Sequence, residues 1–317
     1  AELMSFPGHS ERISACRFSP VVTEGLAGVL TASVYDGTYR LWNNLTGTEE
    51  ADFRHASNYT CSVAFTKSGS RVLSGSFDGS SIVWNYETKK LILKLGVEMD
   101  GQGGWRVERI RDRHEDAVVC CEWHPDEEAE RAITASLDGT VRVWNTKWGN
   151  CVATLKGHSG AVNGCCYNKD GSRMYSASSD GTVREWMSDA PFKCMAIIIG
   201  HYGAVHNVAI ATSGRHLFSV AEDCTLRAWL KVKLEGPPAP NTPVSRAGSR
   251  PFTTGVRASA NSETDLEWFQ WQQIAIFASP FPLRCVGGSP GEEDEEVACG
   301  AANGAVFLLR LMLPGDT

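Results

Sequence analysis

The segment Ser136-Leu137-Asp138-Gly139-Thr140-Val141-Arg142-Val143-Trp144 is one of five related segments in this chain of 317 residues. In every copy an Asp lies six residues before a Trp, and a His precedes the copy. The five segments are SVYDGTYRLW ending at Trp42, SFDGSSIVW ending at Trp84, SLDGTVRVW ending at Trp144, SSDGTVREW ending at Trp186 and AEDCTLRAW ending at Trp229. A repeat this short cannot bury its own apolar face, so neighbouring repeats must pack into one fold.

The spacing of the five Trp residues gives the period of the repeat. Successive steps are 42, 60, 42 and 43 residues, and the step of 60 equals one period plus an insertion that we place at about 96–113. Within a repeat, two short apolar runs flank an Asp-Gly pair, which is the strongest short-range signal for a β-hairpin. Long segments with a 3.6-residue apolar period are missing, so the sequence predicts an all-β fold.

With this pattern the chain resembles the WD40-repeat (WD-repeat) β-propeller family, in which about 40–45 residues form one four-stranded blade. The resemblance is strong over about residues 8–230 and weak over 268–311. The family's Trp-Asp pair is not kept, because Asn43, Asn85, Asn145, Met187 and Leu230 follow the five Trp residues. That position ends a strand, so the resemblance still implies a single propeller domain over residues 1–317.

The resemblance also implies a hydrogen-bond relay of His, Ser, Asp and Trp in each blade. An indole N–H only donates, a hydroxyl donates and accepts, and a carboxylate only accepts, so such a set is satisfied internally. The implied sets are His9, Ser33, Asp36 and Trp42; His55, Ser76, Asp78 and Trp84; His114, Ser136, Asp138 and Trp144; His158, Ser178, Asp180 and Trp186; and His201, Asp223 and Trp229, with Ala221 where the Ser is expected. Catalysis uses one asymmetric site, so a set repeated five times indicates a structural device. We therefore expect no catalytic residue and no cofactor.

The C-terminal part of the pattern allows two counts of blades. The last repeat ends CGAANGAVFLL at residues 299–309, with Asn303 in place of the Asp and Leu309 in place of the Trp. Trp268 lies near the midpoint between Trp229 and Leu309, which favours seven blades. The alternative is six blades with a long insertion at 236–265, a stretch rich in Pro, Gly, Ser and Thr. In both versions the strand Leu3–Phe6 is expected to pair in the last blade, so that the N-terminal strand closes the ring and leaves no open edge.

Composition narrows the classes of partner and site. The net charge of −7 argues against nucleic acid as a partner. No apolar run reaches 18 residues, so we expect no membrane-spanning helix. The eleven Cys residues show no Cys/His spacing that suits zinc, so no metal site is expected. Six of them fall in the strand after a repeat His and are expected to face the core as reduced thiols: Cys16, Cys61, Cys120, Cys121, Cys165 and Cys166. Reduced thiols indicate an intracellular, cytoplasmic protein and leave the nucleus open.

One rim of the repeats carries the candidate partner-binding residues. The residue before each turn Asp and the residue that starts each inner strand should line this rim. They include Arg12, Tyr35, Tyr59, Phe77 and Leu137. Aromatic residues and Arg dominate the binding energy of protein interfaces. We therefore predict a non-enzymatic scaffold that binds a partner peptide or loop on this face, within a multiprotein complex.

Three alternative functions stay open at this point. One is a structural subunit of a large stable assembly that uses the two insertions. Another is a substrate receptor of a ubiquitin ligase. That class usually carries Trp-Asp-x-Arg after a strand, whereas this chain has WNNL, WNYE, WNTK, WMSD and WLKV at those places. An enzyme is the weakest alternative, because the sequence has no Gly-rich phosphate loop or metal-ligand cluster.

Overall fold

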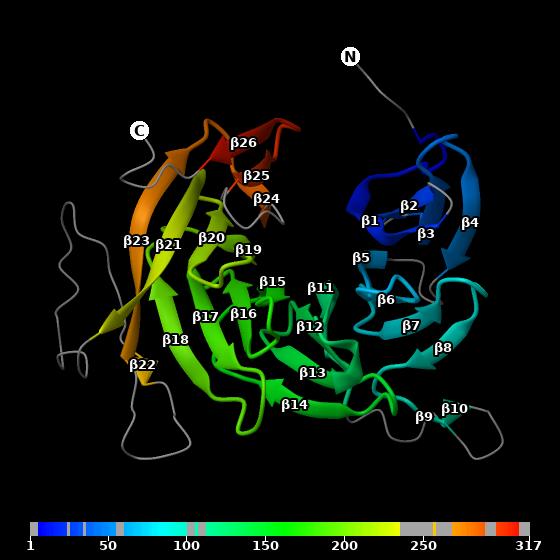
Figure 1. Ribbon diagram of the computed structural model, residues 1–317, viewed down its shortest axis with the longest axis horizontal. Coiled ribbons are helices and arrows are strands. Elements are labelled where there is room, and N and C mark those ends of the chain that lie inside the picture. The colour runs from blue at the N-terminus through cyan, green and yellow to red at the C-terminus, as the bar shows by residue number, and fades with distance from the viewer. Residues whose placement is uncertain are drawn as a thin grey trace. The chain divides into compact units, whose positions relative to one another are not determined.

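The computed structural model describes residues 6–23, 26–33, 36–54, 60–99, 105–106, 112–234, 256–257, 268–288 and 296–310 (Figure 1). These residues form β-strands, turns and one short 3₁₀ helix, η2 (Glu127–Ala129), and they contain no α-helix. The chain divides into two compact units, Ala1–Gly157 and His158–Thr317. The single domain expected from the sequence stays a prediction.

The first unit contains three antiparallel sheets of four strands, which we call blades 1, 2 and 3 (Figure 1). In each blade the strands pair in chain order. Blade 1 has β1 (Ile13–Thr23), β2 (Leu26–Ser33), β3 (Thr38–Asn43) and β4 (Glu49–Arg54); blade 2 has β5 (Thr60–Phe65), β6 (Arg71–Ser76), β7 (Ser81–Asn85) and β8 (Leu91–Lys94); blade 3 has β11 (Val118–Trp123), β12 (Arg131–Ser136), β13 (Val141–Asn145) and β14 (Cys151–Leu155). The pair β9 (Glu98–Met99) and β10 (Trp105–Arg106) lies within the insertion predicted at 96–113.

The second unit contains blades 4, 5 and 6. Blade 4 has β15 (Val162–Tyr167), β16 (Arg173–Ser178), β17 (Thr182–Met187) and β18 (Cys194–Ile199); blade 5 has β19 (Val205–Ile210), β20 (His216–Ala221), β21 (Thr225–Leu234), β23 (Trp268–Ala278) and β22 (Val256–Arg257), paired in that order; blade 6 has β24 (Leu283–Gly288), β25 (Glu296–Ala301) and β26 (Val306–Arg310). Within the described residues, the two units thus hold six sheets of the blade type.

The favoured count of seven blades is therefore wrong, and the register of blade 5 shows why. In blades 1 to 5 the pairing of the third and fourth strands shifts just before the repeat Trp. β23 pairs with β21 along Thr225–Leu234 with this same shift, between Ala228 and Trp229. The segment that starts at Trp268 is thus the fourth strand of blade 5, not the third strand of another blade. The long insertion, predicted at 236–265, leaves blade 5 after Leu234 and returns at Trp268, and it contains β22.

Blade 6 belongs to the same series despite its weak sequence. In all six blades the first strand shifts its register against the second strand after its opening residue. In blade 6 the shift falls between Leu283 and Cys285. A β-bulge at one fixed place is a designed feature of a repeat, so this shared bulge identifies β24 as an inner strand.

The turns explain how the repeats fold locally. In blade 3, Gly139 adopts a φ of 82°, which costs glycine little, and the preceding Asp138 accepts hydrogen bonds from the backbone N–H and hydroxyl of Thr140. After the repeat Trp, Asn145 Oδ1 accepts from the backbone N–H groups of Lys147 and Trp148 at 2.9 Å each. An Asn oxygen therefore does in blades 1 to 3 what an Asp oxygen would do there, whereas blades 4 and 5 have Met187 and Leu230 at this position and form without that contact.

Each unit is held together by apolar side chains between successive blades. In the first unit, Leu30 and Leu41 of blade 1 pack with Val63 of blade 2, and Leu73 of blade 2 packs with Trp123 of blade 3. In the second unit, one cluster joins blades 4 and 5 and another joins blades 5 and 6. The first strands of neighbouring blades lie beside one another in both units. Burial of this kind contributes about 25 cal/mol per Å² of apolar surface.

The N-terminal segment contacts blade 1. Phe6 packs on Trp42 with ring centroids 5.8 Å apart. Residues 1–5 lie outside the described residues, so closure of the ring by the N-terminal strand stays a prediction.

All eleven cysteines are free thiols. Cys121 and Cys165 are buried as expected, but Cys16 is exposed, so the core-facing assignment is wrong for that position. Burial raises the pKa of the Cys61 thiol to about 11.

Candidate functional site

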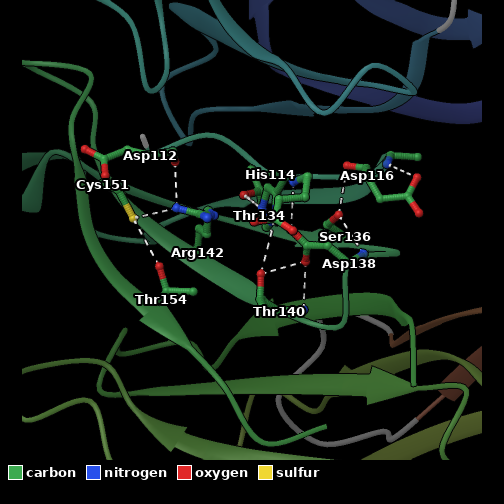
Figure 2. Close-up of polar contacts among 12 residues, drawn as sticks. Asp112, His114, Asp116, Thr134, Ser136, Asp138, Thr140, Arg142, Cys151 and Thr154 are labelled. Atoms are coloured by element: carbon green, nitrogen blue, oxygen red, sulfur yellow. Dashed lines mark hydrogen bonds and ion pairs between the residues drawn. The ribbon is translucent and has the colours of Figure 1, made fainter. Parts of the chain in front are cut away.

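The polar relay of blade 3 joins four side chains from four parts of the repeat, and Figure 2 shows three of them, His114, Thr134 and Asp138. His114 lies in the loop before β11, Thr134 on β12, Asp138 in the turn after β12 and Trp144 on β13. His114 Nδ1 is 2.7 Å from Asp138 Oδ2, and His114 Nε2 is 2.7 Å from Thr134 Oγ1. The Trp144 indole N–H donates to the same hydroxyl oxygen at 2.7 Å. The geometry fits an imidazole that donates from Nδ1 and accepts at Nε2.

The hydroxyl in this relay differs from the one that the sequence predicted. Ser136 does not contact Trp144; its hydroxyl donates to the Asp116 backbone oxygen at 2.9 Å and accepts from the Asp138 N–H. The two positions lie two residues apart on one strand, so they share a face and are easily confused. The bridging hydroxyls are Thr31, Ser74, Thr134, Ser176 and Ser219. A hydroxyl residue in all five copies was the signal that could have found them.

Because the bridging hydroxyl lies two residues earlier than predicted, the relay of blade 5 is complete. Ala221 suggested an incomplete set, but Ser219 Oγ accepts from the Trp229 indole at 2.9 Å and lies 2.7 Å from His201 Nε2. The relays of blades 1 and 4 have the same connections, through Thr31 and Ser176. In blade 2 the Trp84 indole donates to Ser74 Oγ at 3.2 Å, and the predicted His55 lies outside the described residues.

The remaining predicted serines tie the turn to neighbouring backbone. Ser33 donates to the Arg12 backbone oxygen at 3.1 Å, and Ser178 donates to the Gly160 backbone oxygen at 3.2 Å. The Asp78 N–H lies 3.5 Å from Ser76 Oγ. These serines therefore anchor the turn Asp, while the hydroxyl two residues earlier completes the relay.

The relay carboxylates are held in their ionised form. Burial alone would raise the pKa of Asp138, but the hydrogen bonds from His114 and Thr140 outweigh it and bring the pKa well below its usual range. The pKa values of Asp180 and Asp223 are lowered in the same way. Burial lowers the pKa of His201, and the hydrogen bond with Asp223 opposes that effect only in part. His201 is therefore a neutral imidazole next to an ionised carboxylate.

The relays are built to hold strands together. In blades 1, 3, 4 and 5 the relay hydroxyl is buried between a His and a Trp, so it already donates and accepts. In blade 2 the buried Ser74 hydroxyl accepts from Trp84. Within the described ranges, no three His, Cys, Asp or Glu residues group as they would to hold a metal ion. In the same ranges, no helix is long and apolar enough to cross a bilayer.

The rim that carries the predicted partner-binding residues is the end of each blade with the second-to-third-strand turn and the His-containing loop; we call it the turn rim. The first unit places Arg12 on blade 1, Phe77 on blade 2 and Leu137 on blade 3, all at this rim. Arg12 is exposed, Phe77 is 53% exposed and Leu137 is half-buried, with its N–H bonded to the Ala117 oxygen. Tyr35 and Tyr59 lie outside the described residues.

The turn rim of the first unit is continuous from blade to blade. Ser14 on β1 donates to the Thr60 oxygen of β5 at 3.0 Å, which joins blades 1 and 2. At the next junction, a Cβ on Gly79 would lie 2.5 Å from the His114 carbonyl oxygen, so the blade 2 turn presses on the blade 3 loop. Only glycine fits this approach. Arg12, Phe77 and Leu137 thus lie on one connected surface, one residue to a blade.

Sequence reasoning missed the exposed residues at the turn rim of the second unit. Tyr202 is 94% exposed and Phe281 is 43% exposed. They stand in the loops that precede β19 and β24. The sequence prediction considered only two positions in each repeat: the residue before the turn Asp and the first residue of the inner strand. Tyr202 and Phe281 occupy neither position. In blade 5 an aromatic residue directly after the repeat His, Tyr202 after His201, was the available signal; blade 6 has no repeat His, so no such signal marks Phe281.

The comparison with known families agrees with this geometry. The profile of the WD40 repeat, described as "WD domain, G-beta repeat", matches residues 1–43, 47–85, 105–145, 149–186 and 192–229. The chain belongs to the WD40 family. The WD40 repeat is the blade unit of β-propellers, so the six sheets are six such blades, and the sixth is identified by its structure rather than by the profile. WD40 propellers are typically protein-binding scaffolds.

Similarity to individual WD40 proteins is partial. The chain is 36% identical to DDB1- and CUL4-associated factor 13 of Homo sapiens over 80 residues, which are 25% of this chain and 18% of that protein. Over 173 residues, 53% of this chain and 42% of the relative, it is 26% identical to the guanine nucleotide-binding protein subunit beta of Zea mays. Over 127 residues, 38% of this chain and 26% of the relative, it is 31% identical to the ribosome biogenesis protein WDR12 homolog of Trichoplax adhaerens. The chain spans less than half the length of these relatives.

Proposed function

We propose that this WD40 chain is a non-enzymatic scaffold that binds a peptide or loop of a partner protein on the turn rim of blades 1 to 3. One observation carries the proposal: the relay hydroxyls are buried and hydrogen-bonded, whereas Arg12 and Phe77 at the neighbouring rim are exposed. Phe offers apolar contact area, and Arg offers a charge-assisted hydrogen bond to an acidic group. The partner is a protein, and neither nucleic acid nor a membrane is required.

The buried relays are the reason for proposing binding rather than catalysis. A Ser or Thr nucleophile needs an accessible hydroxyl and a base that is free to take its proton. Thr134 is fully buried between His114 and Trp144, and Ser219 is fully buried between His201 and Trp229. The free thiols support placement in a reducing, intracellular compartment, which belongs to the same proposal.

The test is capture of the partner by the purified chain, followed by mass spectrometry. Changing Tyr35, Tyr59 and Phe77 together to Ala should abolish capture of the main partner while the circular dichroism spectrum stays that of the wild type. Trp148→Ala is the matched control, because Trp148 is 73% exposed and lies in the turn after the repeat Trp of blade 3, away from the turn rim. If the triple variant still captures the partner but removal of 96–113 or 236–265 prevents it, the insertions carry the interaction.

A second candidate is association with a ubiquitin ligase. It is favoured by the similarity to DDB1- and CUL4-associated factor 13, whose name states those partners. The missing Trp-Asp-x-Arg segments and the short aligned stretch speak against it. Direct binding of the chain to purified DDB1 in a pull-down would support association with a ubiquitin ligase. Absence of binding would exclude this candidate and leave the scaffold proposal.

A further inference from the structure

The turn rim of blades 5 and 6 presents two aromatic side chains in equivalent loops. Tyr202 follows the repeat His201 in the loop before β19, and Phe281 stands in the corresponding loop before β24. Tyr202 is 94% exposed, more than any other large apolar or aromatic side chain among the described residues. Aromatic side chains supply large apolar contact area at protein interfaces, and Tyr is a frequent hot-spot residue, so two of them in equivalent loops make a candidate contact surface.

Both loops are fixed to one turn, so the two aromatics belong to the same surface. The Tyr202 N–H donates to Asp223 Oδ2 at 3.0 Å. On the other side, the Phe281 N–H donates to Ser279 Oγ at 3.2 Å, and the Ser279 N–H donates to the Cys224 oxygen at 2.8 Å. The turn at residues 222–224 therefore lies between the two loops and holds each in place. A surface that is ordered before binding loses less entropy when a partner arrives.

A charged group sits on the same turn. Glu222 Oε2 is 2.6 Å from His206 Nε2 and 3.1 Å from Arg284 Nη1. Arg284 Nη1 also lies 2.7 Å from His206 Nε2. One ring nitrogen cannot donate to Glu222 and accept from Arg284 at once, so the tautomer of His206 decides which of the two contacts is a hydrogen bond. The three side chains come from β19, the turn after β20 and β24, so they join blades 5 and 6 at the rim. Arg284 and Glu222 are both nearly half exposed.

The N–H donors of Arg284 that make no hydrogen bond within the described residues indicate which charge a partner should carry there. All contacts of Arg284 with the described residues use Nη1, so Nε and Nη2 still have donors to offer. A guanidinium with free donors on two nitrogens matches a carboxylate in a two-point contact. Glu222, by contrast, already shares one oxygen between His206 and Arg284, which leaves little attraction for an incoming cation.

We propose that Tyr202, Phe281 and Arg284 form a docking surface for an acidic segment of a partner protein, with a carboxylate on Arg284 and apolar side chains against Tyr202 and Phe281. This surface goes beyond the proposed function on blades 1 to 3: it uses other residues, in the other unit. The chain carries a net charge of −7, so recognition of an acidic segment relies on contact with Arg284 rather than on long-range attraction.

The experiment uses a phage library of short random peptides as the probe. The library is selected on the immobilised wild-type chain and depleted on the Tyr202→Ala/Arg284→Gln variant. Enriched peptides are synthesised, and their affinities are measured by fluorescence anisotropy. Arg284→Gln should weaken binding by about tenfold or more, because a charge-assisted two-point contact is lost. Arg215→Gln is the matched control: Arg215 is also exposed, but it lies at the opposite end of β20.

Every outcome of the selection bears on the proposal. Enriched peptides should carry Asp or Glu next to an apolar residue, should lose affinity on Arg284→Gln and Tyr202→Ala, and should keep it on Arg215→Gln and on Arg12→Ala/Phe77→Ala. Failure to enrich any peptide, a basic consensus that depends on Glu222, or equal affinity for wild type and Arg284→Gln would overturn the proposal. Loss of binding only on Arg12→Ala/Phe77→Ala would overturn it too and would leave the function proposed for blades 1 to 3 standing.

Discussion

The Trp229 indole donates its N–H to Ser219 Oγ at 2.9 Å, across the second and third strands of blade 5. The same oxygen lies 2.7 Å from His201 Nε2, and His201 Nδ1 lies 3.0 Å from Asp223 Oδ2. Blade 5 therefore has a complete relay even though Ala221 replaces the serine found in other copies. This relay fixes the blade whose third and fourth strands bracket the long insertion.

Ser219→Ala should destabilise the chain by about 1–3 kcal/mol. The substitution leaves the Trp229 N–H and His201 Nε2 buried without their partner, and a buried polar group without a partner costs about that much. The free energy of unfolding from urea denaturation measures the effect. Ser213→Ala, at an exposed loop position in the same blade, is the control and should change little. Equal stability of the two variants would show that Ser219 is not part of a supporting relay.

Trp144→Phe tests the indole donor in blade 3. The ring stays apolar, but Thr134 Oγ1 loses the N–H that donates to it at 2.7 Å. We expect a loss of about 1–3 kcal/mol in unfolding free energy, seen as a lower melting temperature. Trp148→Phe removes an indole N–H from an exposed ring and should leave the melting temperature unchanged. A structural role is contradicted if Trp144→Phe melts like the wild type.

Cys224→Gly should stabilise the chain. Cys224 takes the place of the turn glycine and adopts a φ of 63°, in the left-handed region that favours glycine. Relief of that strain is worth about 1–2 kcal/mol, and the extra freedom of glycine in the unfolded chain takes back part of it. A net gain of about 0.5–1 kcal/mol in a thermal melt is the expected result. The reverse change, Gly181→Cys at a φ of 83°, should cost a similar amount; a loss of stability in Cys224→Gly contradicts the strain argument.

The stability of the fold should fall on the acid side in two stages. Burial lowers the pKa of His201, so the unfolded chain takes up a proton first, and stability begins to fall below about pH 6.5. The pKa values of Asp138, Asp180 and Asp223 are lowered in the folded state, so their contribution is complete above about pH 4 and is lost below it. Chemical unfolding from pH 8 to pH 3 measures both stages. His201→Gln should flatten the upper stage and reduce the share of Asp223 in the lower stage, because the hydrogen bond from His201 helps to lower the pKa of Asp223. An unchanged upper stage would contradict the assignment to His201.

The sequence predicted the blades where each repeat carries its own signals. The Asp-Gly turn, the alternating run and the Trp at a fixed distance placed blades 1 to 5, because each signal fixes a local backbone geometry. The count failed after Trp229, where distance was the only guide. Two periods of a repeat and one hairpin with a long insertion have the same length, and only the pairing of β21 with β23 distinguishes them.

The candidate site was predictable to a similar degree. The His, Asp and Trp of each relay follow from the repeat, whereas the hydroxyl was placed two residues too late, because both positions face the same side of the second strand. The rim residues of blades 1 to 3 follow from the repeat phase. Tyr202 and Arg284 do not, since their importance depends on hydrogen bonds between loops that are far apart in the sequence.

The central claim is that the relays support the fold while the turn rim binds the partner, and one paired measurement tests it most directly. Thermal unfolding and capture of the partner are measured on wild type, Arg12→Ala/Phe77→Ala and Trp144→Phe, with capture at a temperature where all three are folded. We expect the rim variant to melt like the wild type but to lose the partner, and the relay variant to melt at a lower temperature but still to capture it. Capture by the rim variant, or loss of capture by the folded relay variant, would show that the two roles are not divided in this way.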